Sequence, residues 1–175
     1  MPPSYRGAYR IPDGIRQITD GAFYDCSRLT SITIPNSVTK IGYNAFGGCS
    51  SLTSVSLPNT VTNIGDQAFG GCSSLTSITI PNSVTEIGYS AFAWRSSLTS
   101  PVYNTLCFAY MPPSYRGAYR IPDGIKQIAG GAFWSCSSLT SVTIPNSVTE
   151  IGSYTFCGCS RLTSITIPNS VTKIG

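Results

Sequence analysis

Cysteine is the residue type in this sequence with the widest range of chemistry, and the chain contains seven of them. Five recur at one position of a 23-residue repeat and should stack as a column: Cys26, Cys49, Cys72, Cys136 and Cys159. On neighbouring strands ~4.8 Å apart, parallel side chains keep their Cβ atoms farther apart than the ~3.8 Å of a disulfide. We therefore expect free, buried thiols that pack as small apolar groups, with Cys107 the most exposed. Cys157 and Cys159 form a C-x-C pair that is short for a zinc site and has no second pair.

Catalytic chemistry is restricted because the sequence contains no histidine. Without it there is no Ser-His or Cys-His pair, and the commonest transition-metal ligand is missing. A glycosidase needs two carboxylates close together in a cleft. The seven acidic residues are instead scattered over different positions of the repeat: Asp13, Asp20, Asp25, Asp66, Glu86, Asp123 and Glu150. We predict a protein that is not an enzyme and that holds no cofactor or metal.

The elements that would position these residues come from the repeat itself, which restarts at Leu29, Leu52, Leu75, Leu139 and Leu162. In the unit 29–51, the first six residues alternate as a strand, and Pro35-Asn36 then turns the chain. A short second strand follows at Val38 to Ile41, and the Ala-Phe and Cys segment predicts a helical or 3₁₀ turn. A single unit cannot bury its own apolar face, so the units must stack. The sequence predicts a repeat solenoid, rich in β-strands.

The period is broken once, by 18 additional residues between Ser100 and Arg120. Aromatic and β-branched residues around Pro112, Pro113 and Gly117 predict a β-hairpin insert with Pro-Pro-Ser near its turn. Just before it, Trp94 and Arg95 replace the small residue and Cys of sibling repeats. The predicted organisation has four parts: a partial hairpin insert at 1–10, a first run of repeats at 11–97, an irregular segment with the hairpin insert at 98–120, and a second run at 121–175.

Charge and hydropathy exclude two kinds of partner. The formal net charge is +4, only 10% of residues are charged, and no two Lys or Arg residues are adjacent, so we expect no nucleic-acid partner. No apolar stretch is long enough to insert into a membrane. Residues 1–15 recur unchanged as 111–125, where the Met is internal. We therefore expect the chain to be a fragment of a longer array, without its caps or targeting segment.

The sequence pattern IPxxVTxIGxxAFxxCxxLTSIxIP resembles the BspA-like leucine-rich repeats, also called the Treponema pallidum type, and the resemblance covers nearly the whole chain. The segment YMPPSYRGAYRIPDGI is similar to the hairpins that interrupt such arrays. The resemblance implies a curved, right-handed leucine-rich-repeat solenoid with parallel strands. It also implies a large protein, secreted or at the cell surface, that adheres to host or neighbouring-cell molecules.

Two exposed surfaces are candidates for ligand binding. One is the outward face of the first strand of each unit, with columns at Thr30, Thr53, Thr76, Thr140 and Thr163 and at Ser31, Ser54, Ser77, Ser141 and Ser164. The other is the insert and its twin, which concentrate the residue types common in interface hot spots: Tyr103, Phe108, Tyr110, Tyr115, Arg116, Tyr119 and Arg120, with Tyr5, Arg6, Tyr9 and Arg10. The structural alternative for the first surface is that its Thr residues only support the strands and keep the exposed sheet soluble. The alternative for the second is that its aromatic residues only pack within a hairpin that docks on the solenoid.

These observations leave two functions open. The first is a non-catalytic binding or adhesion module whose partners are protein or glycan ligands, such as host extracellular matrix or molecules of neighbouring cells. The second is a structural spacer with no ligand of its own. Because the ends of a solenoid leave strand edges and apolar residues uncovered, we also expect end-to-end self-association.

Overall fold

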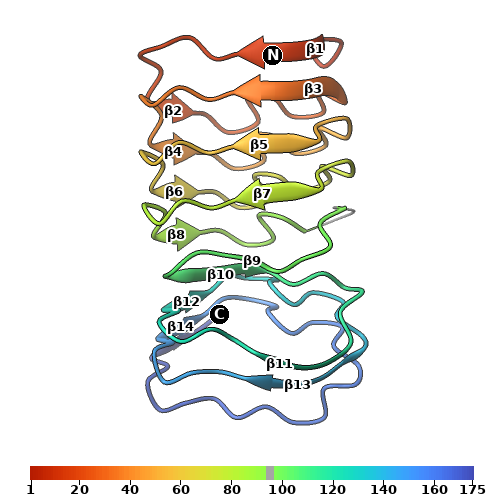
Figure 1. The fold of residues 1–175 in the computed structure, drawn as a ribbon, viewed down its shortest axis with the longest axis vertical. Helices are drawn as coiled ribbons and strands as arrows, with labels where there is room; N and C mark the ends of the chain where they lie inside the picture. The colour runs from red at the N-terminus through yellow and green to blue at the C-terminus, as the bar shows by residue number, and fades with distance from the viewer. Residues whose placement is uncertain (94–96) are drawn as a thin grey trace.

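The computed structural model describes residues 1–93 and 97–175, so the predictions for Trp94 and Arg95 lie outside the described residues. The chain winds into a β-solenoid: the turns of residues 1–93 stack edge-on along the long axis, whereas those of residues 107–175 are tilted relative to them (Figure 1). The turns are related by the 23-residue repeat, and almost all strand pairs are parallel. The repeat solenoid, rich in β-strands, that the sequence predicts is thus confirmed.

The first strands of the turns, which we call the main strands, lie side by side. A four-stranded sheet has the order β1 (Arg6–Arg10), β3 (Arg28–Thr33), β5 (Ser54–Ser56) and β7 (Ser77–Thr79). In the second run, β11 (Gly117–Arg120) pairs with β13 (Leu139–Thr143). Figure 1 shows β1, β3, β5 and β7 pointing in the same direction, and β11 is parallel to β13.

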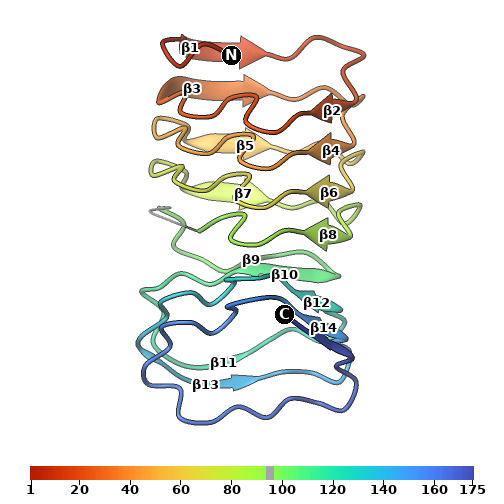
Figure 2. The same cartoon turned by 180° about the vertical axis from the view of Figure 1, so that it is seen from behind.

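The second strands of the turns form two further sheets of very short strands. One contains β2 (Gln17–Ile18), β4 (Lys40–Ile41), β6 (Asn63–Ile64) and β8 (Glu86–Ile87), as Figure 2 shows from behind. The other has the order β15 (Lys173–Ile174), β14 (Glu150–Ile151), β12 (Gln127–Ile128), β10 (Cys107–Tyr110) and β9 (Val102–Tyr103). We call this side of the molecule the short-strand side.

The core is a set of columns that run along the axis. Phe46 and Phe69 are fully buried, and the rings of Phe23, Phe46, Phe69 and Phe92 stack at centroid distances of 5.1, 5.1 and 5.5 Å. Burial of each such side chain contributes roughly 1.5–3 kcal/mol. Since only the neighbouring turns can remove these rings from water, the turns depend on one another for stability.

The segments predicted as helical or 3₁₀ turns are instead separate hydrogen-bonded turns, and no helix occurs among the described residues. The Gly47 N–H donates to the Asn44 carbonyl at 3.0 Å, and the Cys49 N–H donates to the Phe46 carbonyl at 3.2 Å. Asn44 and Gly48 have positive φ angles of 50° and 74°. A left-handed residue cannot continue a right-handed helix, so each turn ends after one bond. No helix in the part of the chain that the structure describes is long and apolar enough to cross a membrane.

The region of the broken period contains a hairpin, but its turn is not at Pro-Pro-Ser. The antiparallel pair is β9 with β10, and Tyr103 lies opposite Phe108. The turn is stabilised by Asn104, whose side-chain oxygen accepts the N–H groups of Leu106 and Cys107 at 2.9 and 2.7 Å. The predicted position was wrong because Asn104 provides this tight turn eight residues before Pro112.

The residues after this hairpin form a turn of the solenoid. Phe108 pairs in parallel with Ile128 and so takes the place of the isoleucine column, while β11 pairs in parallel with β13. The Met111 N–H donates to the Ala132 carbonyl at 2.7 Å, the same bond that Phe46 makes to Ala68. The identical segment at the N-terminus behaves alike, because β1 pairs in parallel with β3.

Candidate binding surface on the main strands

The exposed side chains of the main strands, in the four-stranded sheet and in the pair of β11 with β13, are together called the outer face. Within β3, Leu29 and Ile32 point into the core, whereas Thr30, Ser31 and Thr33 are exposed. The same alternation of buried and exposed side chains occurs in the other main strands, such as β5 and β13. The hydroxyl residues of the outer face are Thr30, Ser31, Thr33, Ser54, Ser56, Ser77, Thr79, Thr140, Ser141 and Thr143.

Hydroxyl groups elsewhere in the solenoid are used to join its turns. At the second strands, the Thr39 hydroxyl donates to the Arg16 carbonyl at 3.2 Å and the Thr62 hydroxyl to the Thr39 carbonyl at 3.3 Å. At the corners, the Ser83 hydroxyl donates to the Val61 carbonyl at 2.7 Å. Each bond links a residue to the preceding turn, so these hydroxyls have a structural role.

The hydroxyls of the outer face make no such bonds. Across residues 1–93 and 97–175, the first-strand Thr and Ser columns contain one hydrogen-bonded hydroxyl, from Thr76 to the Thr53 carbonyl at 3.4 Å. The remaining hydroxyls point to solvent with both donor and acceptor capacity unused. The face is therefore a regular array of hydrogen-bonding groups that the fold itself does not require.

The predicted tyrosine residues mostly face the core. Tyr9 pairs with Ile32 and Tyr119 with Val142, both of which are inward positions. The Tyr119 ring lies 5.7 Å from that of Phe108 and 6.2 Å from that of Phe133. Burial raises the pKa of Tyr119 to about 12. These contacts support the packing alternative for Tyr9 and Tyr119.

The other aromatic candidates also pack against neighbouring rings or in the core, and only Tyr103 is largely exposed. Tyr5 and Tyr115 pack against Tyr9 and Tyr119, and their hydroxyls donate to the carbonyls of Ala8 and Ala118 at 2.7 and 2.9 Å. Phe108 and Tyr110 are 0% and 6% exposed, so a ligand cannot reach them. Tyr103 is 45% exposed and stacks on Phe108 at 5.9 Å.

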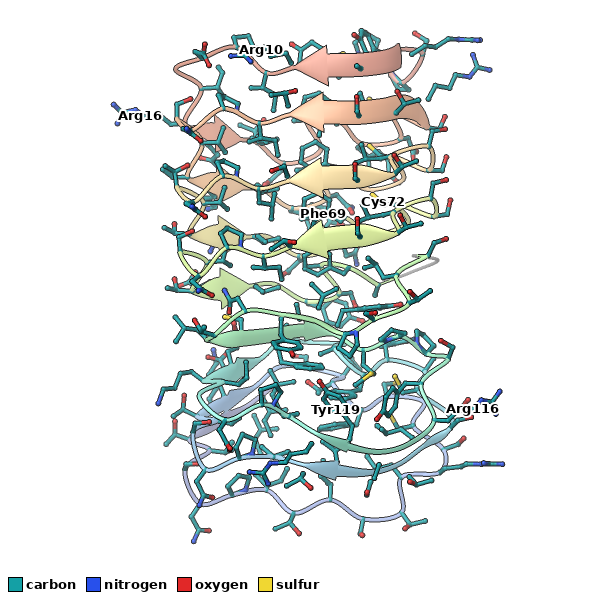
Figure 3. The ribbon with its side chains drawn as sticks, viewed as in Figure 1. Arg10, Arg16, Phe69, Cys72, Arg116 and Tyr119 are labelled. Atoms are coloured by element: carbon teal, nitrogen blue, oxygen red, sulfur yellow. The ribbon has the colours of Figure 1, made fainter. Side chains whose placement is uncertain are left out.

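The predicted arginine residues point outward and join the outer face. Arg10 lies beside Thr33 and Arg120 beside Thr143 in the strand register. Arg6 lies beside Arg28, a residue that the sequence reasoning missed although it occupies the position just before the repeated Leu. Figure 3 shows Arg116 pointing away from the solenoid and Tyr119 pointing into it. The two surfaces predicted separately are thus one surface.

Two of these arginines have acidic partners. Arg10 contacts Asp13 at 3.3 Å and Arg120 contacts Asp123 at 3.1 Å, and all four side chains are well exposed. Exposed pairs of this kind contribute only about 0–1 kcal/mol, so they can exchange partners easily. Arg6, Arg28 and Arg116 have no ion pair with any residue that the structure describes.

The cysteine residues are free thiols, as predicted, and all but Cys157 are buried. The prediction that Cys107 is the most exposed was wrong: its thiol is fully buried and donates to the Thr85 carbonyl at 3.3 Å. In the column, the Cys72 thiol donates to the Phe46 carbonyl of the preceding turn at 3.2 Å. Burial raises the pKa of Cys72 and of Cys136 to about 12, which makes both thiols poor nucleophiles.

Acidic residues gather on the opposite surface, along a polar groove of about 560 Å³ on the short-strand side. Sequence reasoning treated them as scattered, but Asp20, Asp66, Glu86 and Glu150 all line this groove. Each carboxylate has a partner. The Asp20 and Asp66 carboxylates accept the backbone N–H groups of Tyr43 and Tyr89 at 2.8 Å. Glu86 accepts from Asn63, and Glu150 pairs with Lys173 at 2.8 Å. In the described parts of the chain, no group of three or more Cys, Asp and Glu residues could hold a metal ion.

Comparison with known proteins identifies the repeat. Residues 8–108 and 107–175 match the model of the BspA type leucine rich repeat region, with six copies. No curated protein has a significantly similar sequence.

Solved structures share the fold. A leucine-rich repeat protein from T. pallidum is 31% identical with a TM-score of 0.63, and the alignment covers 95% of this chain and 72% of that protein. A leucine-rich repeat protein from Eubacterium ventriosum is 25% identical with a TM-score of 0.59, covering 96% of this chain and 55% of that one. The pneumococcal vaccine antigen PcpA, at 20% identity and a TM-score of 0.58, has the same fold, and 51% of it is covered. The family model matches almost the whole chain, and the chain therefore belongs to the BspA-type leucine-rich repeat family.

Proposed function

We propose that the chain is a non-catalytic binding module of a cell-surface or secreted protein, and that its outer face binds protein or glycan ligands. The observation that carries this proposal is the difference between the two sets of hydroxyl groups. Those at the corners and second strands join the turns, whereas those of the outer face have almost no partner in the described structure. A ligand that lies on the face finds donors and acceptors already exposed and held in place by the sheet.

The rigid repeat supports this role. Neighbouring main strands lie ~4.8 Å apart, so equivalent hydroxyls recur at a constant spacing along the axis. An extended polymer can use many of them at once, and each adds a modest contribution of about 0.5–1.5 kcal/mol. The surface location rests on the family, one of whose structural neighbours is a vaccine antigen.

The second candidate is a spacer. It is favoured by the unbroken stacking of Phe23 to Phe92, which produces a rigid rod without requiring a ligand. In that case the exposed Thr and Ser residues only keep the sheet soluble.

Capture on immobilised extracellular-matrix proteins and glycans separates the two functions. The test variant is Ser54→Gln with Ser77→Gln, which adds neutral bulk to the outer face. Its matched control is Thr19→Gln with Ser153→Gln, at two exposed positions on the short-strand side. We expect the intact chain to be captured and the test variant to bind at least about tenfold more weakly, since about 1.4 kcal/mol of lost contact suffices. Capture of nothing, or equal loss in both variants, would support the spacer.

A further inference from the structure

Basic and acidic residues are distributed differently over the two sides of the solenoid, and the short-strand side carries both signs, since Lys40 and Lys173 line the same groove as the acidic residues. In the described main strands every charged residue is an arginine: Arg6, Arg10, Arg28 and Arg120. Four of the seven acidic residues line the groove on the short-strand side, and two more are in the turns next to Arg10 and Arg120. A net charge of +4 alone does not reveal this distribution. The outer face is therefore positive, whereas the two signs offset each other along the groove of the short-strand side.

The arginines without partners form two clusters. In the first, Arg6 and Arg28 are neighbours on paired strands. The second spans two turns: Arg116 immediately precedes β11, Arg161 occupies the same repeat position as Arg28, just before the repeated Leu, and Ser138 occupies that position in the turn between them. All four are exposed, and none forms an ion pair with a residue that the structure describes. About five turns at ~4.8 Å separate the clusters, a distance of roughly 25 Å. Ser54, Ser56, Ser77 and Thr79 of the outer face lie between them, followed by β9, where the main-strand sheet is interrupted.

From this arrangement we infer that the ligand of the outer face is a linear polyanionic glycan, with sulfate or carboxylate groups, that lies along the solenoid axis and bridges the two arginine clusters. The inference rests on the proposed function and specifies its ligand class. Guanidinium groups bind sulfate and carboxylate through paired hydrogen bonds. The Ser and Thr hydroxyls between the clusters suit the hydroxyl groups of the sugars.

The face does not suit a single-stranded nucleic acid, which is another linear polyanion. Such ligands are held by aromatic side chains on which the bases stack. On this surface Tyr9 and Tyr119 point inward, against Phe23 and Phe133. Among the described residues, the main strands thus offer hydroxyl groups and arginines, and the exposed Tyr103 of β9 is a single ring that already stacks on Phe108.

Affinity measured against heparin oligosaccharides of increasing length tests the bridge. Because the second cluster binds intramolecularly once the first is occupied, affinity should rise steeply when the oligosaccharide can reach both. Two variants each remove one cluster: Arg6→Gln with Arg28→Gln, and Arg116→Gln with Arg161→Gln. The matched control is Arg16→Gln with Lys126→Gln, which removes the same charge from exposed positions outside the clusters.

We expect each cluster variant to bind long oligosaccharides at least about tenfold more weakly and to lose the dependence on length. The control should keep the affinity within about threefold, because screening at physiological salt limits the effect of distant charges. Equal losses in all three variants, equal affinity for short and long chains, or equally tight binding of single-stranded DNA would overturn the inference. If polyanions fail but another ligand is captured and lost in Ser54→Gln with Ser77→Gln, the proposed function stands and only the ligand class is wrong.

Discussion

Replacing Phe108 by alanine tests whether the interrupted region is part of the solenoid core or a separate excursion. Phe108 is fully buried and stacks on Phe133 at 5.0 Å, with an angle of 7° between the rings. It also contacts Tyr103 at 5.9 Å and Tyr119 at 5.7 Å. A buried Phe→Ala change costs about 3–5 kcal/mol. Since each aromatic pair adds about 0.5–1.5 kcal/mol, the three ring contacts place the loss at the upper end of that range, about 5 kcal/mol.

Urea denaturation followed by circular dichroism measures this loss. The control is Tyr103→Ala, which removes a ring that is 45% exposed and should cost only about 1–2 kcal/mol. A domain of ordinary stability, about 5–15 kcal/mol, would lose a third or more of it in the Phe108→Ala variant. A loss below about 1 kcal/mol, together with weaker ligand binding by the folded variant, would refute the assignment of Phe108 to the core.

Three further predictions concern the cysteine thiols and the close packing of the turns at Gly65. A thiol reagent should modify one of the seven cysteines quickly in the native protein, because only Cys157 is exposed, and a Cys157→Ser variant that still reacts fast would contradict this. Burial raises the pKa of Cys72 and Cys136 to about 12 and of Cys107 to about 11, from an ordinary value of 9.0. As the pH rises above 9, these thiols therefore lose their protons in the unfolded chain while they keep them in the folded protein. The free energy of unfolding should therefore be unaffected by these thiols below pH 9 and should fall as the pH rises toward 12; an unchanged urea midpoint would rule this out. Gly65→Ala should cost about 1–3 kcal/mol by overpacking, since the new Cβ would lie 2.7 Å from the Gly42 carbonyl carbon. Gly70→Ala, with its nearest atom at 3.2 Å, should cost less, and equal costs would show that the turns are not closely packed at Gly65.

Much of the fold could be predicted because the repeat fixes side chains at constant positions. A recurring Leu, Ile or Phe must be buried by its neighbours, so the Phe column and the free thiols followed directly from spacing. The position of Pro35 also predicted the end of the main strand correctly, since proline cannot donate to the ladder.

The interrupted turn could not be predicted from the period. Ile87 and Phe108 are 21 residues apart and Phe108 and Ile128 are 20 apart, so a search for 23-residue spacing does not find this turn. Its core positions also carry different residue types, with Met111 where other turns have Phe. Alternation alone did not show that Arg6 and Arg116 share a face with the hydroxyls, because that depends on the parallel register of β1 with β3 and of β11 with β13.

Mapping a bound ligand by NMR tests the central claim, that the outer face of the main strands is the binding surface. With a long heparin oligosaccharide as the probe, chemical-shift changes should concentrate on the outward hydroxyl residues, such as Thr30 and Ser54, and on the side chains of Arg6, Arg28, Arg116 and Arg161. Shifts centred instead on Lys40, Lys126 and Lys173, on the short-strand side, would contradict it.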